Sequence, residues 1–255
     1  MKHLVKAAVA TVLLVGAGAA NASIEKNAGG LNEAYLSAYD FTTGKTFSFD
    51  TGVTFNELVA NESNAAYSLN FDFSADANWL NFITGATTSA IKYVVAVGNT
   101  GDLGAAITSN AQLTPNVEND LGIFFGFDVA SAIEKHAIDL NTGLVVNSLL
   151  NESRLSLDTD SPLSGQHANA DSVWGSWIQD PQANYGQAIG FQLGMLDNNT
   201  GANIASTFAG QWTLAGNSLT YAAATSAVPL PGAVWMFGAA LMGMLGVSRR
   251  KAVAA

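Results

Sequence analysis

Residues 67–74 read Tyr-Ser-Leu-Asn-Phe-Asp-Phe-Ser, so apolar and polar side chains alternate along the whole stretch. Successive side chains of a β-strand point to opposite faces, and alternation therefore places one face on a core and the other in water. Similar alternation recurs in the stretches 91–97, 121–129 and 189–195. A helix would instead need apolar residues every three or four positions. These stretches predict strands as the dominant element.

Shorter alternating rows bring the expected total to about ten strands. They lie at residues 36–41, 46–49, 137–140, 144–149, 154–157, 208–214 and 219–221. Helices are expected to be few and short, at residues 56–64, 76–83 and 129–135. Many antiparallel strands joined by short turns indicate an all-β fold, and we expect an antiparallel β-sandwich or jelly roll.

Three loops share the pattern Asp-x-x-Thr-Gly, at residues 40–44, 139–143 and 197–201. An aspartate at the start of a turn accepts hydrogen bonds from the backbone just ahead of it, and glycine takes the positive φ that a tight turn needs. Each loop lies between strand-like rows, so the pattern predicts hairpins.

The same acidic loops raise calcium as an alternative. Asp139 and Asn141 have the spacing of the first and third ligands of an EF-hand. The rest of that pattern is absent, because Gly143 occupies the fifth position and Leu150 the twelfth, where a glutamate is needed. The hairpin interpretation is therefore preferred. No cofactor is expected, and loop-bound Ca²⁺ stays an alternative for which the sequence locates no ligand set.

Composition excludes several classes of protein. The chain has 255 residues, no cysteine and a formal charge of −10. Without cysteine there is no disulfide scaffold, thiolate metal site, cysteine nucleophile or c-type haem attachment. The acidic balance argues against a nucleic-acid partner, which requires a basic surface. The segment between the two termini, residues 23–227, holds all 20 acidic residues and only five basic ones, which gives it a charge of −15.

The N-terminus, residues 1–22, has the order of a secretory signal peptide. Two lysines form a positive region, residues 7–19 are almost entirely apolar, and Ala20 and Ala22 supply the small-x-small cleavage pattern. We predict cleavage before Ser23, which leaves residues 23–227 as an exported β-sandwich domain.

The C-terminal segment, residues 228–251, reads VPLPGAVWMFGAALMGMLGVSRRK. A transmembrane helix is predicted over residues 231–248, and the stretch 230–248 would span about 28 Å as a helix, close to the roughly 30 Å of a bilayer core. The proline motif before it consists of Val228, Pro229, Leu230 and Pro231. The basic stop after it consists of Arg249, Arg250 and Lys251, which are expected to stay in the cytoplasm.

This order of proline motif, short apolar helix and basic cluster resembles the PEP-CTERM sorting domain of Gram-negative bacteria, in a Val-Pro-Leu-Pro variant. The resemblance covers residues 228–251. It implies recognition by an exosortase, an enzyme often associated with exopolysaccharide production, followed by cleavage near Pro229–Pro231 and delivery to the cell surface or matrix. Leu230 stands where the typical motif has glutamate. The alternative to cleavage is therefore a helix retained as a membrane anchor.

The longest irregular stretch, residues 158–186, holds the candidate ligand contacts Trp174 and Trp177. Paired tryptophans near amides and carboxylates stack on sugar rings, although they also fill cores under long loops. Ser164, His167 and Asp171 lie close together, but no Gly-x-Ser-x-Gly motif accompanies them, and no histidine pair has zinc-ligand spacing.

The sequence thus predicts a non-enzymatic, exported structural protein of the cell surface or exopolysaccharide matrix of a Gram-negative bacterium. Its expected partners are an exosortase-like enzyme, the membrane through its C-terminal helix, and an exopolysaccharide. Three alternatives stay open: a carbohydrate-binding module using Trp174 and Trp177, a secreted hydrolase, and a permanently anchored membrane protein.

Overall fold

A computed structural model describes residues 24, 32–101, 104–109, 129–141, 153–157, 182–196, 200 and 203–223. The elements are, in chain order, β1 (Glu33–Asp40), β2 (Lys45–Thr54), α1 (Phe55–Ala60), β3 (Leu69–Asp72), α2 (Ala77–Ile83), η1 (Thr88–Ala90), β4 (Ile91–Asn99), β5 (Gly104–Thr108), α4 (Ala130–Asn141), β6 (Ser153–Leu157), β7 (Ala183–Asn184), β8 (Ala188–Leu196), β9 (Asn203–Ala215) and β10 (Ser218–Ala223).

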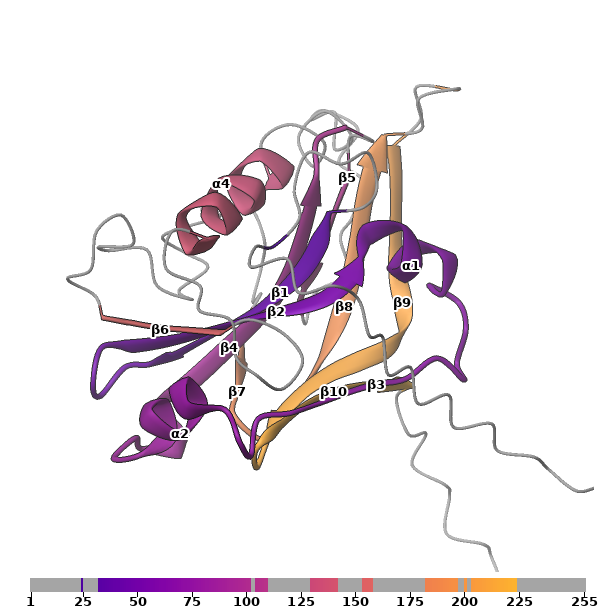
Figure 1. Cartoon of the computed structure of the whole chain (residues 1–255). Helices are drawn as coiled ribbons and strands as arrows, with labels where there is room; N and C mark the ends of the chain where they lie inside the picture. Colours follow the sequence, from indigo (N-terminus) through magenta and orange to yellow (C-terminus); the bar gives the residue numbers. More distant parts are fainter. Residues whose placement is uncertain are drawn as a thin grey trace, which may run out of the picture. The chain divides into compact units, whose positions relative to one another are not determined.

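The described strands form one antiparallel sheet of ten strands (Figure 1). Its order is β3-β10-β9-β8-β5-β4-β1-β2-β6, and β7 pairs with the start of β4. All the pairings between the described strands are antiparallel, as in β1–β2 and β8–β9. The predicted mostly-β, antiparallel fold with few helices is confirmed.

The sheet curls so that strands near its opposite ends face each other. The ring of Phe47 in β2 lies 5.3 Å from that of Phe73, just after β3. The rings of Phe49 and Phe71 are 5.6 Å apart. These contacts enclose one large cluster of buried side chains, which we call the inner core.

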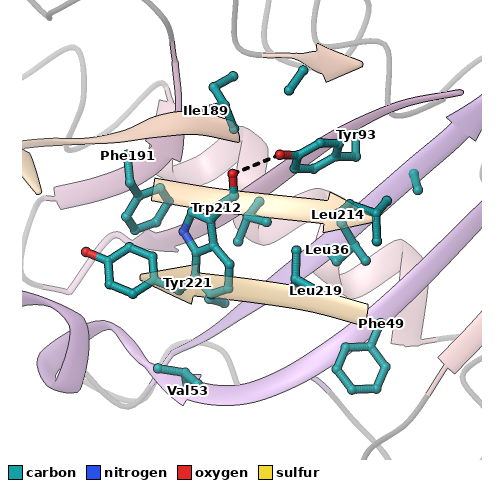
Figure 2. Packing of buried hydrophobic residues seen from close by; sticks show 14 of the residues in the cluster. Leu36, Phe49, Val53, Tyr93, Ile189, Phe191, Trp212, Leu214, Leu219 and Tyr221 are labelled. Carbon is teal, nitrogen blue, oxygen red and sulfur yellow. Dashed lines mark hydrogen bonds between the residues drawn. The ribbon is translucent and has the colours of Figure 1, made fainter. Parts of the chain in front are cut away.

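The inner core is rich in large rings, and Figure 2 shows how side chains from separate strands meet in it. The Tyr93 hydroxyl donates to the backbone oxygen of Trp212 at 2.9 Å, which ties β4 to β9 across the cluster. The Trp212 and Tyr221 rings lie 5.0 Å apart. Gly210 leaves space for this packing, because a Cβ there would lie 2.3 Å from the Tyr221 ring.

The first Asp-x-x-Thr-Gly loop forms the predicted hairpin between β1 and β2. The Asp40 carboxylate accepts from the Thr42 backbone N–H at 2.9 Å and from the Thr43 hydroxyl at 2.7 Å. Gly44 closes the turn with φ of 66°. The third loop connects the paired strands β8 and β9, although residues 197–199, 201 and 202 lie outside the described part.

Two predictions around residue 139 are wrong. A strand was expected at residues 137–140 and a hairpin turn at 139–143, whereas α4 continues through Asn141. Its buried apolar residues follow a helical spacing and lie on one side of the helix: Ala130, Ile133, Ala137 and Leu140. Packing of this side against β4 favours a helix over a strand here. The helix expected at 129–135 is therefore present but longer than predicted, because it continues to Asn141.

The other two predicted helices are confirmed, in shortened form. Thr54 caps α1 by accepting from the Glu57 backbone N–H at 3.2 Å, and Asp76 caps α2 by accepting from the backbone N–H groups of Asn78 and Trp79. Of the helices in the described ranges, none is both long and apolar enough to cross a membrane. The predicted strand at 121–129, apart from Val129, lies outside the described residues, as do the predicted strand at 144–149, the signal peptide and the helix 231–248.

Candidate functional site

The most elaborate polar arrangement in the described part holds α4 on the sheet. Along β4 the side chains alternate, so that Tyr93 and Val95 enter the inner core while Val94 and Ala96 face α4. The face under α4 is lined mainly by small and aliphatic residues. We call α4, the polar side chains that fix it and the residues packed beneath it the α4 seat.

A buried carboxylate joins the start of α4 to the sheet. Glu134 is 7% exposed, and its Oε1 accepts from the Asn32 amide at 2.7 Å and from the Thr100 backbone N–H at 2.8 Å. The Thr100 hydroxyl donates to Oε2 at 2.9 Å. Because a charge removed from water must be compensated by hydrogen bonds, these donors are what make the buried position of Glu134 tolerable.

Close backbone contact complements this network. A Cβ on Gly98 would lie 2.5 Å from the carbonyl oxygen of Ala130, so only glycine at this point of β4 lets the first turn of α4 come so near. One turn further, the Tyr35 hydroxyl donates to the Ile133 carbonyl at 3.2 Å. Complete burial raises the pKa of Tyr35 well above its usual range.

The C-terminal end of α4 is held by two other segments. Arg154 of β6 donates to the carbonyl oxygens of Asp139 at 3.0 Å and Leu140 at 3.2 Å. A cation there also suits the negative end of the helix dipole. Asn141, the last helical residue, forms two hydrogen bonds with the backbone of Ile24. Its Oδ1 accepts from the Ile24 N–H at 2.8 Å, and its Nδ2 donates to the Ile24 carbonyl at 3.1 Å.

The polar contacts of the α4 seat attach α4 to the sheet and to Ile24. His136 is 2% exposed and lies with its ring 5.7 Å from that of Tyr35, which leaves it closed to a substrate. Within the described ranges, no group of three or more carboxylates and histidines is arranged to hold a metal ion. The arrangement joins the N-terminal Ile24, a helix and the sheet.

None of the candidate site residues of the sequence analysis belongs to the described part of the chain. The residues Ala20, Ala22, Ser23, His167, Trp174, Trp177, Val228, Pro229, Leu230, Pro231, Arg249, Arg250 and Lys251 all fall outside the described part of the chain. The described tryptophans, Trp79 and Trp212, are fully buried in the inner core. Trp79 also donates its Nε1–H to the Asn217 side chain at 3.0 Å, so both act in packing.

The α4 seat was missed by the sequence analysis. The one signal that points to it is the helical spacing of apolar residues through Leu140, which was interpreted as a strand. The sequence around Asn32 and Thr100 contains no pattern that predicts their hydrogen bonds with the distant Glu134. Comparison of the chain with models of protein families, with curated proteins and with solved structures finds no match.

Proposed function

We propose that this chain is an exported structural protein of the cell surface or exopolysaccharide matrix, sorted through its C-terminal segment and processed at both ends. The observation that carries the proposal is the segment 228–251, with its proline motif, apolar stretch and terminal Arg249-Arg250-Lys251, in a chain that begins with a signal-peptide pattern. An exosortase-like enzyme is the proposed processing partner.

The compact unit that holds the sheet ends before the proline motif. The last strand, β10, ends at Ala223, before the proline motif at 228–231, and the compact unit that contains the sheet ends at the same residue. A cut near Pro229–Pro231 would therefore leave this compact unit whole.

We further infer that the exported body is a β-sandwich made by curling one continuous sheet. Support comes from the ring contacts of Phe47 and Phe49 with Phe73 and Phe71, which join strands near opposite ends of the sheet order. A closed hydrophobic interior of this kind suits a protein that must persist outside the cell without disulfides, because a chain of this size can bury enough apolar surface to be stable without them.

Processing at the proline motif is tested with matched variants in cells that contain the sorting enzyme. Pro229→Ala combined with Pro231→Ala should keep the protein in the membrane fraction at precursor mass. Leu230→Glu, which restores the usual residue of the motif, should leave processing at least as efficient as in the parent. Immunoblots of membrane and extracellular fractions give the readout.

The matched control is Pro162→Ala, which changes a proline outside the motif. It should fractionate as the parent does. Release of the double proline variant into the extracellular fraction at the processed mass of the parent would contradict sorting through this motif. Retention of all variants in the membrane would instead support the permanently anchored alternative.

A further inference from the structure

Three side chains form a row across the start of β4, on the side of the sheet that carries α4. Phe41 directly follows β1, Lys92 lies in β4 and Asn184 lies in β7. Lys92 pairs in register with Tyr39 of β1 on one side and with Asn184 on the other. Alternate side chains share a face, so Phe41 lies on the same face as Tyr39, away from the inner core. Two strand spacings give the row a width of roughly 10 Å.

The first member of the row is an aromatic ring that reaches solvent. Phe41 is 48% exposed, and its ring lies edge-on to that of Tyr39 with the ring centres 4.6 Å apart. Its backbone N–H donates to the carbonyl oxygen of Ala90 at 3.2 Å, which fixes its position beside β4. A ring held in this way can stack against the apolar C–H face of a sugar.

The second member is a positive charge in an acidic body. The Lys92 Nζ lies 5.6 Å from the centre of the Phe41 ring, and within the described ranges Lys92 forms no ion pair with a carboxylate. The neighbouring Asp40 carboxylate instead accepts from Thr42 and Thr43 of its own turn. At physiological salt, charges more than about 8 Å away are largely screened. The ammonium group therefore attracts a carboxylate locally, although residues 23–227 carry a charge of −15.

The third member is a pair of exposed amides on a fixed turn. The Asn184 Nδ2 donates to the Gln187 Oε1 at 3.0 Å, which leaves the Asn184 Oδ1 to accept and the Gln187 Nε2 to donate outward. The Tyr93 hydroxyl donates to the Gln187 carbonyl at 2.7 Å, and the Gly186 N–H donates to the Leu214 carbonyl at 2.8 Å. These bonds tie the turn to strands of the inner core, so the amides are held in position before any ligand arrives.

We call Phe41, Lys92, Asn184 and Gln187 the strand-end platform, and we infer that it binds a polysaccharide whose sugars carry carboxylate groups. One sugar ring stacks on Phe41, and its carboxylate accepts from the Lys92 ammonium group. A hydroxyl of the next sugar both donates and accepts, which matches the amide pair of Asn184 and Gln187. The inference deepens the proposed function and rests on it for the presence of an exopolysaccharide around the protein.

The test measures binding of the purified full chain, in detergent micelles at about 0.15 M salt, to immobilised polygalacturonate. Fully methyl-esterified polygalacturonate is the matched ligand control, because it has the same main chain with its carboxylates blocked. The parent protein should bind the free acid form at least fivefold more tightly than the ester.

Point variants locate the contact. Phe41→Ala and Lys92→Gln should each weaken binding to polygalacturonate at least fivefold. Two matched controls make the same kinds of change elsewhere: Leu80→Ala removes a side chain that is 44% exposed, and Lys135→Gln removes a charge from a lysine side chain that is 69% exposed. Both controls should bind as the parent does, and all four variants should keep the circular dichroism spectrum of the parent.

Equal binding of the acid and the ester would overturn the carboxylate contact. Absence of binding to both polymers would overturn the inference, and so would equal affinities of the platform variants and their controls. These results are independent of sorting, because they are measured on purified protein. A native protein that stays in the membrane at precursor mass would contradict the proposed function while leaving the measured affinities unchanged.

Discussion

The inner core is stabilised mainly by the packing of aromatic rings, whereas the α4 seat is stabilised by individual polar contacts. Strand β4 contributes alternate side chains to both. In the inner core, the rings of Phe47, Phe73 and Trp79 lie 5.1 to 5.3 Å from one another, and they come from β2, from the residue after β3 and from helix α2. In the α4 seat, the decisive contacts are single polar pairs such as Asn32–Glu134, which are 102 positions apart.

This difference indicates that α4 could loosen from the sheet while the inner core stays packed. Ring packing is shared among many neighbours, so the loss of one side chain is felt by the whole sheet. A polar pair binds two points, and its loss frees mainly the element that it attaches. We therefore expect global effects from changes in the inner core and local effects from changes in the α4 seat.

Alkaline pH should produce the largest effect, because the inner core depends on neutral tyrosines. Burial raises the pKa of Tyr221 from 10.0 to about 12, and burial also raises the pKa of Tyr93 and Tyr67. Unfolded tyrosine ionises near pH 10. The stabilisation is therefore complete below about pH 10 and is lost as the pH rises through 12 and beyond.

Tyrosinate absorbance and circular dichroism, recorded together during titration, check this expectation. Both should change in one cooperative step above pH 10. Gradual ionisation of all the tyrosines near pH 10 with an unchanged β-sheet spectrum would contradict the burial of these side chains.

Trp79→Ala should give the next largest effect. Trp79 is fully buried against Phe47, Phe73 and Phe82, and removal of a core aromatic costs about 3–5 kcal/mol of unfolding free energy. Urea denaturation measures the loss, and the whole sheet should become less protected from hydrogen exchange. Leu80→Ala is the matched control on the same helix, at a residue that is 44% exposed, and should change the stability by about 0.5 kcal/mol or less. Equal losses of unfolding free energy in the two variants would contradict the claim that ring packing stabilises the inner core.

Glu134→Ala should give a smaller and more local effect. It leaves the amide of Asn32 without one acceptor and the backbone N–H of Thr100 without its carboxylate, at a cost of about 1–3 kcal/mol. Hydrogen exchange should accelerate in α4 and remain slow in β9. Lys135→Ala, which removes the ion pair between an exposed lysine and the largely buried Asp139, should cost less, about 1 kcal/mol or below. Uniform acceleration across the sheet in Glu134→Ala would show that the two regions are not separable.

The sequence reveals the inner core much better than the α4 seat. Alternation identifies β1, β2, β4, β8, β9 and β10, because each directs every second side chain into the inner core, even where the other face is buried as well, as in β4. It misses β5, whose sequence Gly-Ala-Ala-Ile-Thr has no polar face and is entirely buried. Gly104 there is required by packing, since a Cβ would lie 2.9 Å from the Phe55 ring.

The polar contacts of the α4 seat cannot be deduced from local patterns. Asn32, Thr100 and Asn141 are ordinary loop or helix-end residues, and their partners are set only when the chain has folded. The docking of Ile24 is hidden for the same reason. The predicted cleavage site and sorting motif come from order and composition alone, and they remain predictions.

The most direct test of the central claim, that this is a sorted protein with both ends removed, is the intact mass of the native protein, measured separately in membrane and extracellular fractions. We predict an extracellular species that begins at Ser23 and ends near Pro229–Pro231, with precursor only in the membrane. A single membrane species extending to Ala255 would contradict processing, and an extracellular species that retains residues 1–22 would contradict the assigned signal peptide.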